Sequence, residues 1–261
     1  IMTSDGARAL TEVPKSIVVL GGGVIGVEFA SVMRSFGADV TIVEALPRLV
    51  AAEDPAVSTA LERAFKKRGI AFRTGVRFES ATPTESGVTV RLEGGDELSA
   101  DVLLVAVGRG PSTAGLGFED AGVSVERGFV ITDERCRTSV DGVYAVGDIV
   151  PGLQLAHRGF AQGIFVAEDI ARLDPVPLVE SSIPRVTYCE PEIASVGLTQ
   201  AQATEQYGDR VETYEYNLGG NGKSQILRTQ GFVKLVRVKD GPVVGIHMVG
   251  SRMGEQIGEA Q

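Results

Sequence analysis

A short apolar run that ends abruptly in three glycines constrains this chain more than any other feature. Residues 16–20 are strand-length and, after Ser16, wholly apolar. Gly21, Gly22 and Gly23 follow directly, and from residue 24 to 36 the hydrophobic pattern is helical. The pattern predicts a buried parallel strand, a tight turn and a helix. The helix is expected to bury a stripe made of Val24, Val27, Ala30, Val32 and Phe36.

The next segments repeat this alternation. Residues 39–44 form a second strand-like run, and residues 54–68 follow as an amphipathic helix that Asp54 caps and Gly69 closes. Strand, helix, strand, helix is the pattern of a βαβ unit with a parallel sheet. Beyond it a hairpin is expected, with arms at residues 88–93 and 97–105 and a turn at residues 94–96.

The second half of the chain predicts two further parts. A strand at residues 142–146 and a helix at residues 157–173 come first, and a proline-containing linker at residues 174–184 follows. A helix near Ala201 and several short strands then indicate a small α+β domain. Those strands are expected at residues 185–188, 214–217, 232–238 and 243–249. The fold class is therefore α/β, with a Rossmann-type domain at residues 1–113 and further segments at residues 114–175 and 176–261.

The glycine turn has the spacing of a dinucleotide-binding motif. Gly21 allows the tight turn, Gly23 lets the backbone approach a pyrophosphate, and Gly26 lets helix and strand pack closely. The helix N-terminus offers N–H groups and a positive dipole end to the phosphates. Glu44 ends the second strand, where it can accept hydrogen bonds from both ribose hydroxyls and would repel a 2′-phosphate. NAD is therefore favoured over NADP, although Arg48 lies close enough in sequence to leave a phosphate contact open.

Charge and cysteine content exclude other classes of function. The chain has 25 basic and 34 acidic residues, a net charge of −9, which argues against nucleic acid or an anionic membrane as a partner. No run of about 18 apolar residues and no signal-peptide pattern occur, so a cytoplasmic protein is expected. Cys136 and Cys189 are the only cysteines, and they form neither a disulfide framework nor a metal-ligand pattern.

Beyond this motif, the sequence resembles the dihydrolipoamide dehydrogenase family of FAD-dependent pyridine nucleotide-disulfide oxidoreductases. The resemblance extends over essentially the whole chain in five blocks that follow one another in the family's order. The blocks are residues 21–30 together with 40–50, residues 105–111, residues 143–148, residues 154–157 and residues 188–199. It implies that residues 114–175 are the C-terminal part of an FAD-binding domain, and that residues 176–261 are an incomplete interface domain of a homodimer.

The resemblance also implies cofactor contacts. Glu28 would face the flavin and nicotinamide, although an exposed glutamate one turn into a helix needs no function. Gly108 would meet the nicotinamide through its backbone, and Val76 is either core or a backbone contact to NAD. Asp148 would bond the ribityl chain of FAD. The remaining implied contacts to NAD are Gly21, Gly22, Gly23, Val24, Ile25, Gly26, Val27 and Glu44, and those to FAD are Gln154, Leu155, Ala156 and His157.

The reaction that the resemblance implies is electron transfer from a dithiol, through a disulfide and FAD, to NAD. The dithiol would be dihydrolipoamide of a 2-oxo acid dehydrogenase complex. The redox cysteine pair and the histidine base of the family have no counterpart here, so no catalytic residue is assigned and the chain is expected to be an inactive fragment by itself. Two alternatives stay open: an NAD-binding and dimerisation module without turnover, and a relative of glutathione or mercuric reductase, against which Glu44 weighs.

Overall fold

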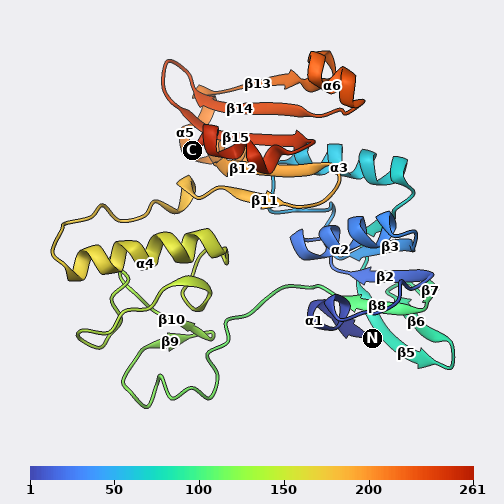
Figure 1. Cartoon of the computed structure of the whole chain (residues 1–261), viewed down its shortest axis with the longest axis horizontal. Coiled ribbons are helices and arrows are strands. Elements are labelled where there is room, and N and C mark those ends of the chain that lie inside the picture. The colour runs from blue at the N-terminus through green and yellow to red at the C-terminus, as the bar shows by residue number, and fades with distance from the viewer. The chain divides into compact units, whose positions relative to one another are not determined.

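The computed structural model describes all residues, 1–261, in two compact units (Figure 1). The first unit combines residues 1–108 with residues 186–261, and the second comprises residues 109–185. None of the helices has both the length and the apolar character needed to cross a membrane.

The first unit is built around a parallel sheet in the strand order β1-β8-β2-β3-β4. Every neighbouring pair in this sheet is parallel, which confirms the Rossmann-type fold class predicted from the alternation of strands and helices. The strands are β1 (Met2–Thr3), β2 (Ser16–Leu20), β3 (Asp39–Glu44), β4 (Ala71–Thr74) and β8 (Val102–Val105). The helices that accompany them are α1 (Ser4–Arg8), α2 (Val24–Ser35) and α3 (Pro55–Arg68).

Helix α2 begins where the glycine turn predicts, but the buried stripe is different from the expected one. Val24, Val32 and Phe36 are all more than a third exposed. The buried positions are Gly26, Val27, Ala30, Ser31 and Met33. The spacing of residues 26, 27, 30 and 33 follows one face of a helix more closely than the predicted set, because 24 and 32 lie on flanks that the sheet does not cover.

A separate antiparallel sheet contains β5 (Phe78–Thr84), β6 (Gly87–Leu92) and β7 (Glu97–Ala100). The hairpin is confirmed, but its second arm ends at Ala100 rather than at residue 105. Asp101 interrupts it: its carboxylate accepts from the N–H groups of Lys15 and Ser16, and its own N–H donates to Ser16 Oγ. These contacts direct the chain into β8, which pairs with β2 instead.

The C-terminal part of the first unit is a five-stranded sheet in the order β11-β12-β15-β14-β13. It shares one hydrophobic core with the Rossmann part, because Ile193, Phe232 and Val249 pack in the same cluster as Leu61 and Phe65 of α3. The sequence did not predict β12 as a strand. The elements are β11 (Arg185–Thr187), β12 (Glu192–Gly197), α5 (Gln200–Tyr207), η3 (Gly208–Arg210), β13 (Val211–Asn217), η4 (Leu218–Gly220), α6 (Gly222–Leu227), β14 (Phe232–Val238), β15 (Val243–Gly250), η5 (Met253–Glu255) and η6 (Ile257–Ala260).

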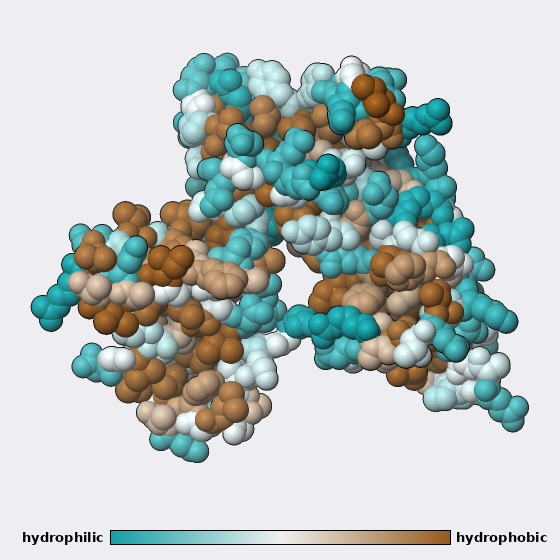
Figure 2. Space-filling model, in the orientation of Figure 1, coloured by the Kyte–Doolittle hydropathy of each residue, from teal (hydrophilic) through white to brown (hydrophobic).

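The second unit has little regular structure besides one long helix. Its elements are β9 (Val125–Glu126), β10 (Phe129–Val130), η1 (Gly147–Ile149), α4 (Ala156–Ile170) and η2 (Glu180–Ser182). The strand expected at residues 142–146 is wrong, since that segment makes only an isolated bridge between Tyr144 and Arg137, and a strand requires a paired partner. Helix α4 ends three residues before the expected end. Figure 2 shows apolar residues gathered on the region that Figure 1 labels α4, whose exposed apolar side chains include Phe160 and Ile164.

Candidate functional site

The glycine turn lies at the carboxyl end of β2, between β2 and α2. Gly21 has φ +107°, and a Cβ atom there would overlap the carbonyl oxygen of Ala106 after β8. A Cβ atom on Gly26 would overlap the carbonyl oxygen of Gly21. At Gly23 a Cβ atom would meet nothing within 4 Å, so this face of the turn is open. Two glycines are therefore required by packing, whereas the third leaves space for a ligand.

The N-terminus of α2 has the properties of an anion site. Its N-cap, Gly23, provides no side-chain hydrogen bond, and no acidic residue lies in the first turn. The first N–H groups of a helix lack intrahelical acceptors, and the helix dipole favours negative charge there. Val24 is exposed, Ile25 is half-buried and Val27 is fully buried. The turn and the uncapped helix together fit the pyrophosphate of a dinucleotide.

Glu44 is held at the end of β3, the strand beside β2, by two backbone donors. Gly22 N–H donates to its Oε2 (2.5 Å) and Leu46 N–H donates to its Oε1 (2.7 Å). Each carboxylate oxygen can accept more than one hydrogen bond, so Glu44 keeps capacity for ribose hydroxyls. Arg48, the candidate for a 2′-phosphate contact, donates instead to the carbonyl oxygens of Ala51 (2.6 Å) and Glu53 (3.3 Å).

Two other residues implied by the resemblance lie at the same edge of the sheet. Val76 N–H donates to the Glu44 carbonyl oxygen (3.1 Å), and the half-buried Val76 side chain packs against a hydrophobic cluster. Gly108 is exposed, has φ +141° and follows β8. In parallel sheets, ligands bind outside the carboxyl ends of the strands where the strand order reverses, as it does here between β2 and β8. The glycine turn, Glu44, Val76 and Gly108 thus border one edge.

Glu28 in α2 is oriented by the C-terminal part of the unit. Tyr188 N–H donates to Glu28 Oε1 (2.8 Å). Burial raises the pKa of Glu28 above its ordinary value, and the hydrogen bond from Tyr188 only partly opposes this shift. A half-buried carboxyl group near the end of the glycine turn can therefore hold a proton at higher pH than a surface glutamate.

The residues implied to contact FAD lie together in the second unit. Asp148 is exposed in η1, and Gln154 Nε2 donates to its backbone carbonyl oxygen (3.3 Å). Leu155 is the N-cap of α4 and makes no side-chain capping bond, and the next residue, Ala156, is exposed. His157 is also exposed, and its Nε2 lies 2.7 Å from the Pro184 carbonyl oxygen. An exposed carboxylate beside an uncapped helix N-terminus fits the hydroxyl and carbonyl groups of a flavin.

Two buried residues of α4 that the sequence analysis missed support the loop around Asp148. Arg158 is only 3% exposed; its Nη2 donates to the Pro151 carbonyl oxygen (2.6 Å) and its Nε donates to Glu180 Oε1 (2.6 Å). Gly147 N–H donates to Gln162 Oε1 (2.8 Å). A charged residue inside a helix gives no sequence signal for burial, because its partners lie in loops before and after the helix.

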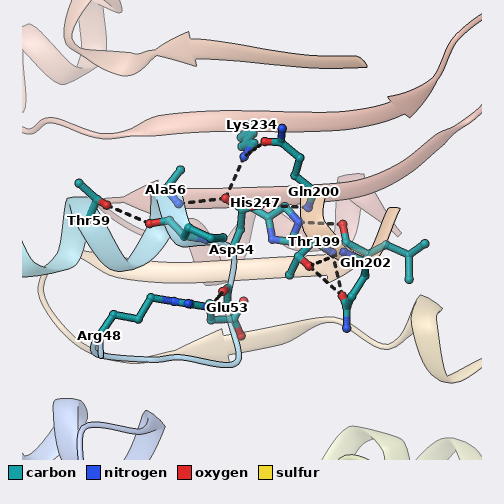
Figure 3. A network of polar contacts seen from close by, with 12 residues as sticks. Arg48, Glu53, Asp54, Ala56, Thr59, Thr199, Gln200, Gln202, Lys234 and His247 are labelled. Carbon is teal, nitrogen blue, oxygen red and sulfur yellow. Dashed lines mark hydrogen bonds and ion pairs between the residues drawn. The ribbon is translucent and has the colours of Figure 1, made fainter. Parts of the chain in front are cut away.

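A second buried polar cluster, also missed, lies where α3 meets the C-terminal sheet (Figure 3). Asp54 is 0% exposed and caps α3 through the Ala56 N–H (3.0 Å). Lys234 Nζ on β14 donates to Asp54 Oδ1 (2.9 Å) and to Gln200 Oε1 (2.8 Å). The sequence identified Asp54 only as a helix cap; its partner lies 180 residues away in the chain.

Neither cysteine is a reactive thiol in its own surroundings. Both are buried, at 7% exposure for Cys136 and 6% for Cys189. Burial raises the pKa of the Cys136 thiol, and it raises the pKa of Cys189 to about 12. Because the thiolate is the nucleophile in thiol exchange, both groups are unreactive in this conformation.

The family model for pyridine nucleotide-disulphide oxidoreductases matches residues 1–163, and the model for the dimerisation domain of the same proteins matches residues 183–261. The first match alone spans more than half of the chain. The chain belongs to the pyridine nucleotide-disulphide oxidoreductase family. This confirms the resemblance found in the sequence.

Relatives within the family carry the name dihydrolipoyl dehydrogenase. One from Chlorobaculum tepidum is 44% identical over 99% of this chain, and one from Bacillus subtilis is 37% identical over 100% of it. In each case the chain spans 56% of the relative's length.

Solved structures agree with this membership. LpdA from Mycobacterium tuberculosis superposes with a TM-score of 0.91 at 29% identity, covering 98% of this chain and 56% of that one. A Cu(II) complex of the HOCl-induced flavoprotein disulfide reductase RclA from Escherichia coli gives 0.92 at 28% identity, covering 99% of this chain and 59% of that one.

Proposed function

We propose that this chain binds NAD(H) at the carboxyl edge of its parallel sheet and presents the nicotinamide to a flavin. The open face at Gly23, beside the uncapped N-terminus of α2, is the observation that carries the proposal. There the first-turn N–H groups of α2 bind the pyrophosphate. Glu44 binds the adenosine ribose, Val76 and Gly108 contact the dinucleotide through their backbones, and Glu28 lies beside the nicotinamide.

The same site favours NAD over NADP. Glu44 places a negative charge where a 2′-phosphate would lie, and two backbone donors fix its position. The Arg48 guanidinium, which could neutralise such a phosphate, is engaged with backbone carbonyl groups of its own loop. The charge balance at the ribose therefore disfavours NADP.

The parent activity that fits these features is dihydrolipoyl dehydrogenase, the name carried by the relatives. In such an enzyme a dithiol, dihydrolipoamide of a 2-oxo acid dehydrogenase complex, would be oxidised and NAD reduced. Bound FAD would supply the two-electron chemistry between them. The share of this chain is to bind and orient: Asp148 and the start of α4, residues 154–157, hold part of the flavin, and residues 183–261 pair two subunits.

A second function fits the state of the cysteines. With both thiols buried and protonated, this chain has no group of its own that exchanges electrons with a dithiol. It would then serve as a dinucleotide-binding and dimerisation module. Adding FAD, dihydrolipoamide and NAD and following NADH formation distinguishes the two functions, because only the enzyme turns over.

Fluorescence titration with NADH and with NADPH tests the proposed site. Saturable binding of NADH, tighter than that of NADPH, is expected. Absence of NADH binding to the folded protein would refute the site, and equal affinities would refute the role given to Glu44.

A further inference from the structure

The segment that joins β3 to α3, residues 45–54, is bonded to the glycine turn at one end. Val50 N–H donates to the Gly22 carbonyl oxygen (2.8 Å), while Gly22 N–H donates to Glu44. Leu49 is fully buried, and its Cδ2 lies so close to Gly22 that a Cβ atom there would approach it to 2.6 Å. The position of this segment therefore fixes both the turn and the carboxylate proposed to hold the ribose.

The other end of the segment is bonded to the C-terminal sheet (Figure 3). Ser195 Oγ donates to Glu53 Oε2 (2.5 Å), and Gln200 N–H donates to Asp54 Oδ2 (3.1 Å). The Lys234 ammonium, 7% exposed, pairs with Asp54. These contacts come from strands β12 and β14 and the start of α5, so the sheet holds residues 53 and 54 by both charge and hydrogen bonds.

The middle of the segment needs support from both ends. Val50 has φ +44°, a left-handed conformation that is an outlier for a β-branched residue and persists only when the surrounding structure imposes it. Its N–H is bonded to Gly22, and its carbonyl oxygen accepts from the Glu53 N–H (2.8 Å). Loosening Asp54 would release this residue toward a relaxed conformation and move the groups bonded to it.

We propose that Lys234, through its buried ion pair with Asp54, is a positioning residue for the dinucleotide site. It holds residues 45–54, and through them Gly22 and Glu44, in the geometry that binds NAD(H). The C-terminal sheet thereby contributes to cofactor affinity without touching the cofactor. This inference rests on the proposed NAD(H) site. The coupling path is a contiguous set of hydrogen bonds and buried side chains from Lys234 to Gly22.

The test compares two variants with the unchanged protein. Lys234→Gln removes the charge, and the double variant Asp54→Ser/Lys234→Met removes both charges while Ser still caps α3. The double variant leaves no unpaired buried charge, so it folds even where Lys234→Gln does not. In each folded variant the NADH dissociation constant is expected to rise about 3- to 30-fold. Amide hydrogen exchange of Gly22, Leu46 and Val50, measured without NADH, is expected to accelerate.

Asp169→Asn is the matched control. Asp169 is a buried carboxylate paired with Arg135 and Arg137, and all three residues belong to the second unit. The control should lose stability but keep the NADH dissociation constant and the exchange rates of the three amides. Unchanged affinity and exchange in the folded Lys234 variants would overturn the inference. If the unchanged protein binds no NADH but exchange still accelerates in the variants, the proposed function fails and only the mechanical coupling stands.

Discussion

At the scale of single residues, two glycines of the dinucleotide-binding motif are subject to different constraints. A Cβ atom on Gly26 would overlap the Gly21 carbonyl oxygen, whereas one on Gly23 would face open space, and Gly23 has extended backbone angles that alanine adopts without strain. The motif alone does not separate these roles, because both positions are simply glycine in the sequence. The structure assigns one glycine to packing and leaves the other for a ligand.

Alanine substitutions at these two positions should therefore separate stability from binding. Gly26→Ala should lower the free energy of unfolding by about 1–3 kcal/mol or more, because the added methyl overlaps backbone. Gly23→Ala should unfold at the same denaturant concentration as the unchanged protein but bind NADH about tenfold more weakly or worse, as the methyl obstructs the pyrophosphate. Chemical denaturation and NADH titration measure the two effects. Equal stability losses would show that both glycines serve packing.

Substitution of Glu44 should change cofactor preference. Removing the carboxylate in Glu44→Ala costs about 1.5–3 kcal/mol of NADH binding, the value of a charged hydrogen-bonded pair, whereas NADPH gains from the lost repulsion. Glu44→Gln keeps one acceptor, for either Gly22 N–H or Leu46 N–H, and nearly the same side-chain shape. It therefore shows the effect of removing the charge alone. Paired titrations should show a smaller difference in affinity between NADH and NADPH for both variants than for the unchanged protein. An unchanged difference would show that a residue other than Glu44 sets the cofactor preference.

At the scale of elements, the sequence predicts those whose signals are local. Strand β3 has the predicted bounds. Helix α3 also begins and ends as predicted, because Asp54 and Pro55 mark its start and Gly69 marks its end. The glycine turn and the place of Glu44 at the end of β3 could be predicted for the same reason. Elements that depend on distant partners were missed or misplaced: Asp101 divides the expected arm at residues 97–105, and the segment at residues 142–146 lacks a paired strand. The buried contacts of Arg158 and Lys234 could not be predicted either, because their partners are distant in the sequence.

The cap of α3 should make stability depend on pH in the acid range. Burial alone would raise the pKa of Asp54, but the hydrogen bonds from Lys234, Gln200 and Ala56 and the Lys234 charge outweigh it and hold the pKa below 3.8. A lowered carboxylate pKa gives stability above the unfolded value that is lost as pH falls through the folded value.

Asp54→Asn tests this dependence, since asparagine still caps the helix but leaves Lys234 unpaired. At neutral pH the free energy of unfolding should fall by about 3–5 kcal/mol. The difference from the unchanged protein should be constant above about pH 5 and shrink below the ordinary carboxyl pKa, because protonation of Asp54 then removes the ion pair from the unchanged protein as well. Denaturant unfolding over this range measures it, and a difference that grows toward low pH would contradict the assignment.

The variant Arg158→Met should weaken the contact between helix α4 and the loop that contains Asp148. The methionine fills most of the buried space but donates no hydrogen bond to the Pro151 carbonyl oxygen or to Glu180. A hydrogen bond from a charged donor contributes about 1.5–3 kcal/mol. Amide exchange at Gly147 and Val150 is expected to accelerate, whereas exchange in the first unit stays unchanged. Unaltered protection at Gly147 would assign the support to Gln162 alone.

At the scale of the whole molecule, residues 183–261 match a dimerisation domain, and a homodimer is the expected state in solution. Specific interfaces of standard size have dissociation constants from micromolar to picomolar, so dimers should be detected once the protein concentration exceeds the micromolar range. Sedimentation velocity over a range of concentrations measures the state. A monomer at the highest concentration would show that residues 183–261 do not pair subunits in this chain.

Because Cys189 is buried, the reactivity of its thiol reports how often the first unit opens. Its thiol packs in the core shared by the C-terminal sheet and residues such as Val27 and Ala30 of α2, and its pKa of about 12 leaves almost no thiolate at neutral pH. An alkylating reagent can therefore modify Cys189 only during moments when the sheet and α2 separate. In a Cys136→Ser background, the rate at which Cys189 is alkylated therefore measures how often the sheet and α2 separate. Bound NADH should lower this rate, because it stabilises α2 against the separation.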